Sequence, residues 1–88
     1  MVDVQNVLKE LREEKGLNYQ EMSLILKMNY GNYINLEAGR YGEKIPLRVQ
    51  IILYQVFGVN LKEFNENFGL YVASLRDKAL KKLVGLNV

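Results

Sequence analysis

Hydrophobic residues recur along this chain at the three- and four-residue spacing of amphipathic helices, and no stretch alternates apolar and polar positions as a strand does. The spacing of Val4, Leu8 and Leu11 predicts a first helix over "VQNVLKELREEK". Asp3 is a favourable N-cap for this helix, and Gly16 favours its end. We therefore expect an all-α fold.

Two short helices joined by a tight turn are predicted over "NYQEMSLILKMNYGNYINLEAGR". Asn18 and Glu21 have the spacing of a capping box, which predicts the start of the second helix. Asn29 is the expected cap of the third helix, which should end at Gly39. The positions that should face the core lie one turn apart within each helix, and they are Met22, Leu26, Tyr33 and Leu36.

Three further helices are expected in the rest of the chain. Pro46 suits the first turn of a fourth helix, "LRVQIILYQVF", which should stop at Gly58. A short fifth helix, "LKEFNE", and a sixth amphipathic helix, "GLYVASLRDKALKKLVGL", should follow. The apolar stripe of the sixth helix is Val72, Leu75, Ala79 and Leu83. We expect residues 1–67 to form one domain and residues 68–88 to serve dimerisation or intramolecular packing.

Composition excludes several kinds of chemistry. The chain of 88 residues contains no Cys and no His, so disulfides and thiolate or imidazole metal sites are excluded, together with the commonest general base. No catalytic set, metal site or cofactor motif is visible, and we do not expect an enzyme. The longest apolar run, Ile51–Tyr54, is far shorter than the ~20 residues of a membrane span, and no signal-peptide layout is present. A cytoplasmic protein without membrane contact is expected, and its net charge of +2 is only a weak indication of a nucleic-acid partner.

Three motifs agree in their spacing: "LREEKGL" before the second helix, "LEAGR" at the end of the third, and "FGVNLKEF" after the fourth. With these motifs the chain resembles the Cro and phage-repressor type of helix-turn-helix protein, the XRE family. The resemblance covers Leu8 to Phe64 and needs no gap between Leu8 and Gly39. It implies a compact five-helix, lambda-repressor-like domain, to which this chain adds a C-terminal amphipathic helix.

The resemblance also implies roles for individual residues. In this family the second helix braces across the DNA backbone and the third lies in the major groove. The implied base-contacting residues are Tyr30, Gly31, Asn32 and Asn35, of which Asn35 is the first choice for a base contact, and a bidentate amide side chain can read adenine in the major groove. The implied backbone-contacting residues are Tyr19, Lys27, Arg40 and Lys44. Arg12 and Glu37 match a structural pair that links the first helix to the third.

Several residues depart from the family pattern. Lys27 stands where glycine is common because the backbone is left-handed there, a conformation that costs a side chain roughly 1 kcal/mol. Gly31 either lets the third helix approach DNA closely or is merely tolerated in a first turn. Leu24, Ile25 and Ile34 stand where the family is usually polar, so they are expected to face DNA, the C-terminal helix or another protein.

Two hypotheses of function follow from these residues. The first is sequence-specific binding of double-stranded DNA by a small transcriptional regulator, expected to be a repressor that acts as a homodimer. The second is a protein-interaction module or antitoxin that uses the same scaffold to bind a partner protein through its apolar positions. The DNA hypothesis is the leading one, because the motifs that carry it extend over most of the chain.

Overall fold

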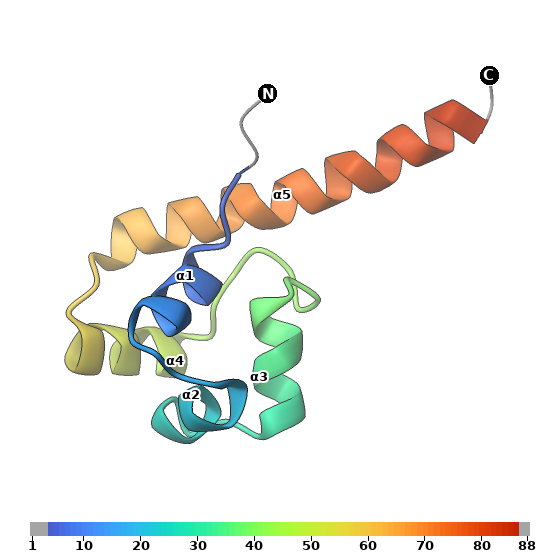
Figure 1. Ribbon diagram of the computed structural model, residues 1–88. Helices are drawn as coiled ribbons and strands as arrows, with labels where there is room; N and C mark the ends of the chain where they lie inside the picture. Colours follow the sequence, from blue (N-terminus) through green and yellow to red (C-terminus); the bar gives the residue numbers. More distant parts are fainter. Residues whose placement is uncertain (1–3, 87–88) are drawn as a thin grey trace.

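The computed structural model describes residues 4–86, which form five α-helices and no strand within that range (Figure 1). The helices are, in chain order, α1 (Val7–Glu14), α2 (Tyr19–Ile25), α3 (Tyr30–Glu37), α4 (Leu47–Ile52) and α5 (Leu61–Leu86). α4 continues into a π-helical turn, Leu53–Phe57, and the chain leaves it at Gly58. The expected all-α class is confirmed.

Asparagine side chains begin four of these helices. In each, the side-chain oxygen accepts a hydrogen bond from a backbone N–H of the first turn, which satisfies one of the donors that a helix start leaves free. The capping residues are Asn6, Asn18, Asn29 and Asn60. The predicted capping box of Asn18 and Glu21 is present in both directions.

The first helix begins later than expected. Its cap is Asn6, and residues 4–6 are not helical, whereas the sequence pattern placed the start directly after Asp3, which lies outside the described residues. Asn6 is held in an extended conformation because its Nδ2 donates to the backbone oxygen of Glu37 at 2.8 Å. A contact with a residue 31 positions away decides this boundary, and no local pattern contains it.

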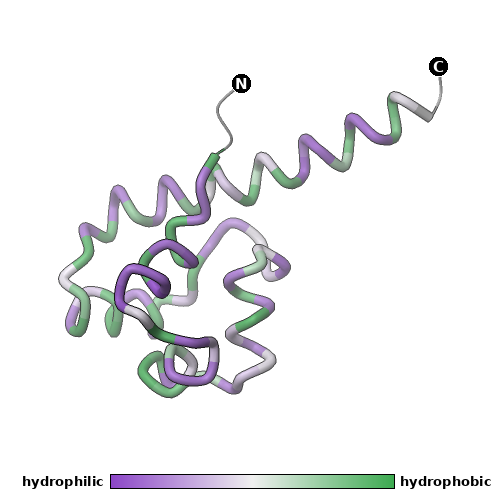
Figure 2. Tube along the Cα trace, viewed as in Figure 1, coloured by the Kyte–Doolittle hydropathy of each residue, from purple (hydrophilic) through white to green (hydrophobic). Residues whose placement is uncertain are grey.

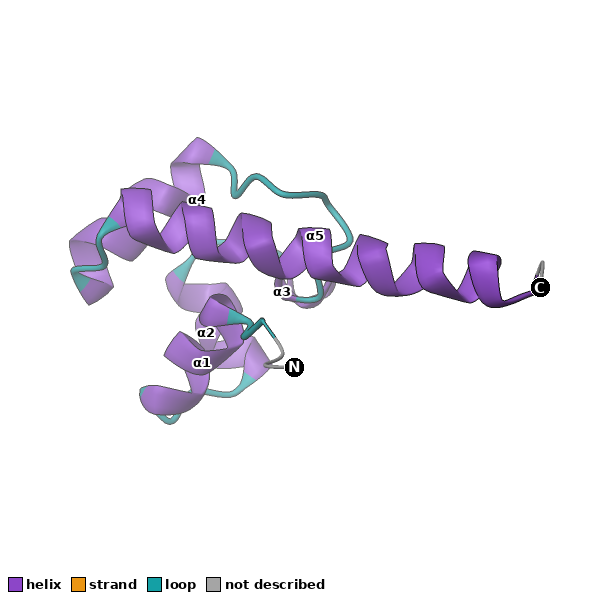
Figure 3. Ribbon diagram, turned by 90° about the horizontal axis from the view of Figure 1, so that it is seen from above, coloured by secondary structure: helices purple, strands orange, loops and turns teal. Residues whose placement is uncertain are grey.

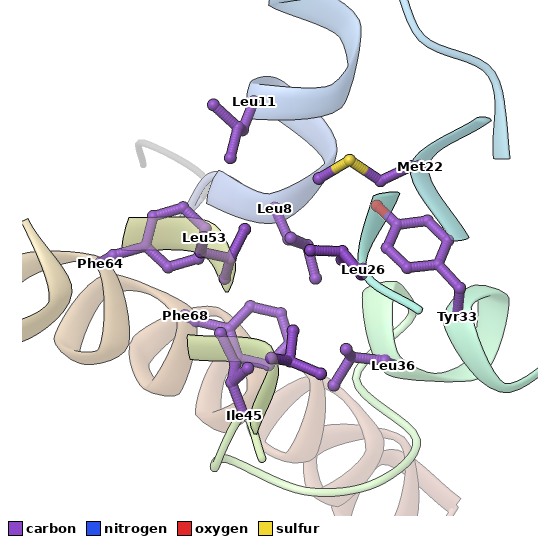
Figure 4. Packing of buried hydrophobic residues seen from close by; sticks show 11 residues of the cluster. Leu8, Leu11, Met22, Leu26, Tyr33, Leu36, Ile45, Leu53, Phe64 and Phe68 are labelled. Carbon is purple, nitrogen blue, oxygen red and sulfur yellow. The ribbon is translucent and has the colours of Figure 1, made fainter. Parts of the chain in front are cut away.

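One hydrophobic core joins all five helices (Figure 4). Phe68 of α5 lies among side chains of the other helices, and the predicted core residue Tyr33 is completely buried. The buried hydrophobic residues are Leu8, Leu11, Met22, Leu26, Tyr33, Leu36, Ile45, Val49, Leu53, Phe64 and Phe68. Every residue that the sequence pattern assigned to the inward faces of α2 and α3 is in this list.

The expected fifth and sixth helices are a single helix, α5, which runs across the other four (Figure 3). The expected sixth helix began at Gly69, and a glycine inside a helix costs about 1 kcal/mol relative to alanine. Phe68, just before this glycine, is in the core, and Tyr71 and Val72 after it pack against the core, so packing on both sides holds the helix together through Gly69. The expected domain boundary between residues 67 and 68 therefore falls inside a helix.

The C-terminal half of α5 extends beyond the other helices and carries apolar residues among its charged ones (Figures 1 and 2). Of the predicted apolar stripe, Val72 and Leu75 are half-buried, while Ala79 and Leu83 are exposed. Although α5 has 26 residues, neither it nor any other helix within residues 4–86 is long and apolar enough to cross a membrane. The outer half of α5 thus carries apolar side chains that remain exposed in a single chain.

Gly39, just after the end of α3, lies close to side chains of α5. Its φ is +80°, and a Cβ there would lie 3.2 Å from side-chain atoms of both Val72 and Leu75. The left-handed backbone and the neighbouring helix therefore both require a glycine.

We predict that Gly39→Ala lowers the free energy of unfolding by about 2 kcal/mol, because strain in the left-handed region adds to overpacking against α5. The matched control is Gly16→Ala, since Gly16 has φ +67° and nothing within 4 Å of its added Cβ. Gly16→Ala should cost only about 1 kcal/mol. Urea denaturation measures both values, and equal losses would show that the contact with α5 carries no cost.

Candidate nucleic-acid interface

The turn between α2 and α3 has the left-handed backbone that the sequence predicted at Lys27, whose φ is +56°. Arg48 of α4 lies against this turn, where its Nη1 donates to the backbone oxygen of Lys27 at 3.0 Å and approaches that of Leu26 at 3.5 Å. Since the last carbonyls of a helix lack partners within it, Arg48 stabilises the end of α2. Through Arg48, α4 thus helps to hold the angle between α2 and α3.

A buried ion pair holds α3 against α1. Arg12 Nε lies 3.0 Å from Glu37 Oε2 and its Nη2 lies 3.2 Å from Oε1, a two-pronged arrangement that is stronger and more directional than a single contact. The hydroxyl of Tyr33 also donates to Glu37, and Arg12 Nη1 donates to the backbone oxygen of Leu17. These contacts join Arg12 and Glu37 as the resemblance implied, and Glu37 is only 3% exposed.

The charge states around this ion pair are well defined. The hydrogen bonds to Glu37 raise the pKa of Arg12, against the lowering effect of burial, so Arg12 stays cationic. Burial and the hydrogen bond to Glu37 both raise the pKa of Tyr33 far above its usual value, so its hydroxyl stays protonated. Arg12 and Tyr33 therefore each keep one protonation state over the physiological pH range.

Tyr19, which the resemblance implied as a contact to the DNA backbone, also packs against the side chains around the Arg12–Glu37 ion pair. Its ring lies beneath the guanidinium of Arg12 at 4.3 Å, a cation–π contact, and its centroid lies 6.3 Å from that of Tyr33. About 38% of the residue remains exposed at the start of α2. Tyr19 thus lies where it can still reach a ligand.

The opposite face of α3 is exposed. Tyr30, Gly31 and Asn32 are exposed and Asn35 is half-buried, so all four expected base-contacting residues lie on the accessible side of the helix. A Cβ at Gly31 would meet only Asn29 Oδ1, at 3.4 Å. The packing of the described residues therefore does not itself require a glycine at position 31.

A chain of hydrogen bonds covers the end of this face. Arg40 Nη1 donates to Asn35 Oδ1 at 2.7 Å, Tyr41 Oη donates to Asn32 Oδ1 at 3.0 Å, and Asn35 Nδ2 donates to Tyr41 Oη at 3.5 Å. The motifs did not single out Tyr41. Its only signal in the sequence is an aromatic residue next to Arg40 at the start of a polar loop.

The remaining expected contacts lie in different places. Lys44 lines a groove of about 1,070 Å³ between the loop before α4 and α5, together with Leu47 and Leu70, so no contact brings it to the exposed face of α3. Arg40 lines a second hollow, of about 320 Å³, together with Lys9 and Ile34. The structure thus brings Arg40, but not Lys44, to the accessible edge of α3.

The three unusual apolar residues have separate surroundings. Ile34 is half-buried and lines the same hollow as Tyr71, so it lies beside the protein's own C-terminal helix. Ile25 is half-buried as well. Leu24 remains 69% exposed and borders a hollow of about 560 Å³ between α2 and α3, together with Tyr30.

The strongest candidate site in the described chain is the polar edge of α3, which consists of Asn32 and Asn35 with the hydrogen-bonded Arg40 and Tyr41. Within residues 4–86, no group of three or more potential metal ligands of the His, Cys, Asp or Glu type lies together. Comparison of the chain with family models, with curated proteins and with solved structures gives no match. The function therefore has to be argued from the geometry of this edge.

A double-mutant cycle tests the buried ion pair between Arg12 and Glu37, which holds α3 against α1. We expect Arg12→Met to lower the free energy of unfolding by about 3 kcal/mol, because it leaves the Glu37 carboxylate buried without a cation. Arg12→Met combined with Glu37→Gln should cost less than the sum of the two single changes, since no unpaired charge remains. Urea denaturation of the four proteins measures this coupling, and strictly additive losses would contradict it.

Proposed function

We propose that this protein is a cytoplasmic DNA-binding regulator, which binds a specific double-stranded sequence as a homodimer and represses by occluding a promoter. The observation that carries the proposal is the two-sided character of α3. One side is buried and braced through Glu37, while the other presents the amides of Asn32 and Asn35. The major groove admits one helix, and amide side chains can hydrogen-bond base edges there.

The charges around α3 support this proposal. α3 itself contains no Lys or Arg, so its amides and Tyr30 are the groups available for reading base edges. Cations flank it instead: Lys27 lies in the turn before α3 and Arg40 in the loop after it, and both are exposed. Contacts between such cations and phosphates contribute affinity without sequence preference and set the position of the helix in the groove.

Of the two explanations for Gly31, close approach of α3 to DNA is favoured over a glycine that the first turn merely tolerates. The packing of the described residues leaves space for a side chain there, and a glycine near the start of a helix weakens it. The absent side chain lowers the profile of α3 between Tyr30 and Asn32. A helix with this profile can lie deeper in the groove.

The outer half of α5 supports homodimerisation. Its exposed apolar residues include Leu83 and Val84, which are 58% and 64% exposed, and Leu80. They lie beyond the part of α5 that packs on the domain, so folding of one chain leaves them unburied. Pairing with the same segment of a second copy would bury them and place two α3 helices in one assembly, as a two-fold symmetric DNA site requires.

One observation favours the second candidate function, a protein-interaction module or antitoxin. Leu24 is largely exposed beside the hollow between α2 and α3, where Met28 and Tyr30 also contribute apolar surface. A side chain of a partner protein could bury this surface. The proposed DNA face and this hollow share Tyr30, so the two functions are separated by variants that leave Tyr30 intact.

We predict that Asn35→Ala weakens binding to the preferred DNA sequence by about 1–3 kcal/mol and leaves non-specific binding nearly unchanged. The preferred sequence is first selected from a random DNA pool, and fluorescence anisotropy then compares it with a scrambled duplex at several salt concentrations. Gln55→Ala changes another exposed amide, on the π-helical turn after α4, and serves as the control. The proposal fails if the wild-type protein shows no salt-dependent DNA binding, or if Asn35→Ala weakens both duplexes equally.

We predict that Leu80→Glu combined with Leu83→Glu converts the dimer to a monomer, because both residues are exposed in one chain and charges there oppose pairing. Multi-angle light scattering measures the mass. Val56→Glu places the same charge at a residue of similar exposure outside α5 and should leave the dimer intact. A dimer that persists in the α5 double variant would place the interface elsewhere.

A further inference from the structure

The hydrogen bonds at the end of α3 determine which groups the side-chain amides of Asn32 and Asn35 can offer to a base. Asn32 Oδ1 accepts from Tyr41 Oη at 3.0 Å, and Asn35 Oδ1 accepts from Arg40 Nη1 at 2.7 Å. The second of these bonds has a cationic donor, and charge-assisted hydrogen bonds are stronger than neutral ones. Each amide oxygen therefore already accepts one hydrogen bond within the protein, which leaves it at most one free lone pair.

The groups left over are mainly donors. Within residues 4–86, the Nδ2 group of Asn32 has no hydrogen-bond partner, so two N–H donors remain there. Asn35 Nδ2 uses one of its two N–H groups on Tyr41, and Arg40 uses one of its five donors on Asn35. The accessible edge of α3 thus presents N–H groups in excess over free acceptors.

Adenine and guanine differ in what they require from such an edge. An amide reads adenine by accepting from N6 through its oxygen while it donates to N7. Guanine presents two acceptors, O6 and N7, in the major groove. An edge whose amide oxygens are engaged and whose N–H groups are free matches guanine.

Tyr41 is the residue that links the two amides. Its hydroxyl donates to Asn32 and accepts from Asn35, and the residue is 52% exposed, outside the hydrophobic core. The fold gains little from a hydroxyl in this position. The hydrogen bonds orient two side chains that point away from the core.

We propose that Tyr41 is a positioning residue of the DNA-reading edge, which turns the amides of Asn32 and Asn35 so that their N–H groups face the bases and the edge selects guanine over adenine. This inference rests on the proposed DNA-binding function. It replaces the reading of adenine that is open to a bidentate amide with a donor-rich edge to which Tyr41, Asn32 and Arg40 contribute.

The test compares the DNA sequences preferred by the wild-type protein, Tyr41→Phe, Asn32→Ala and Tyr54→Phe, each selected from a random pool. Tyr41→Phe removes only the hydroxyl. Tyr54→Phe makes the same change at an exposed tyrosine of the π-helical turn and serves as the control. The midpoint of urea unfolding should be the same for Tyr41→Phe and the wild type, which separates positioning from stability.

The wild type should prefer guanine at the base pair whose preference Asn32→Ala abolishes. Tyr41→Phe should lower the guanine-over-adenine ratio at that same base pair roughly tenfold, with non-specific binding unchanged. An unchanged ratio in Tyr41→Phe, or adenine at that base pair in the wild type, would overturn the inference and leave the proposed function standing. Absence of salt-dependent DNA binding by the wild type would overturn both.

Discussion

The geometry of the domain depends on one buried interaction, the two-pronged ion pair between Arg12 and Glu37. Two charges taken out of water are costly unless every hydrogen-bonding group has a partner, and here Tyr33 and the backbone oxygen of Leu17 complete the set. The pair contributes orientation more than stability. It fixes the rotation of α3 about its axis, so that the opposite face is turned to solvent.

α5 has two roles along its length. Its first half closes the core through Phe64 and Phe68, and its contact with Gly39 sets how closely the end of α3 approaches. Its second half leaves the domain and carries apolar side chains that one chain cannot bury. A single continuous helix therefore ties the position of α3 to the surface through which we propose that two copies meet.

The polar edge of α3 owes its character to the loop that follows the helix. Asn32 and Asn35 alone offer both donors and acceptors, and such amides can turn either way. Arg40 and Tyr41 remove that freedom by engaging both oxygens. The residues that we propose read DNA and the residues that orient them thus come from different segments, and a motif that describes only the helix omits half of this proposed site.

Local patterns were sufficient for much of this protein. The capping box of Asn18 and the inward faces of α2 and α3 depend on residues a few positions apart, so the sequence by itself determined them, and the resemblance implied the left-handed backbone at Lys27. Only the tertiary structure decided the start of α1 at Asn6, the continuity of α5 through Gly69 and the bonds of Tyr41 to Asn32 and Asn35. The first two depend on packing against distant segments, and the third on the path of the loop after α3, which no periodicity encodes.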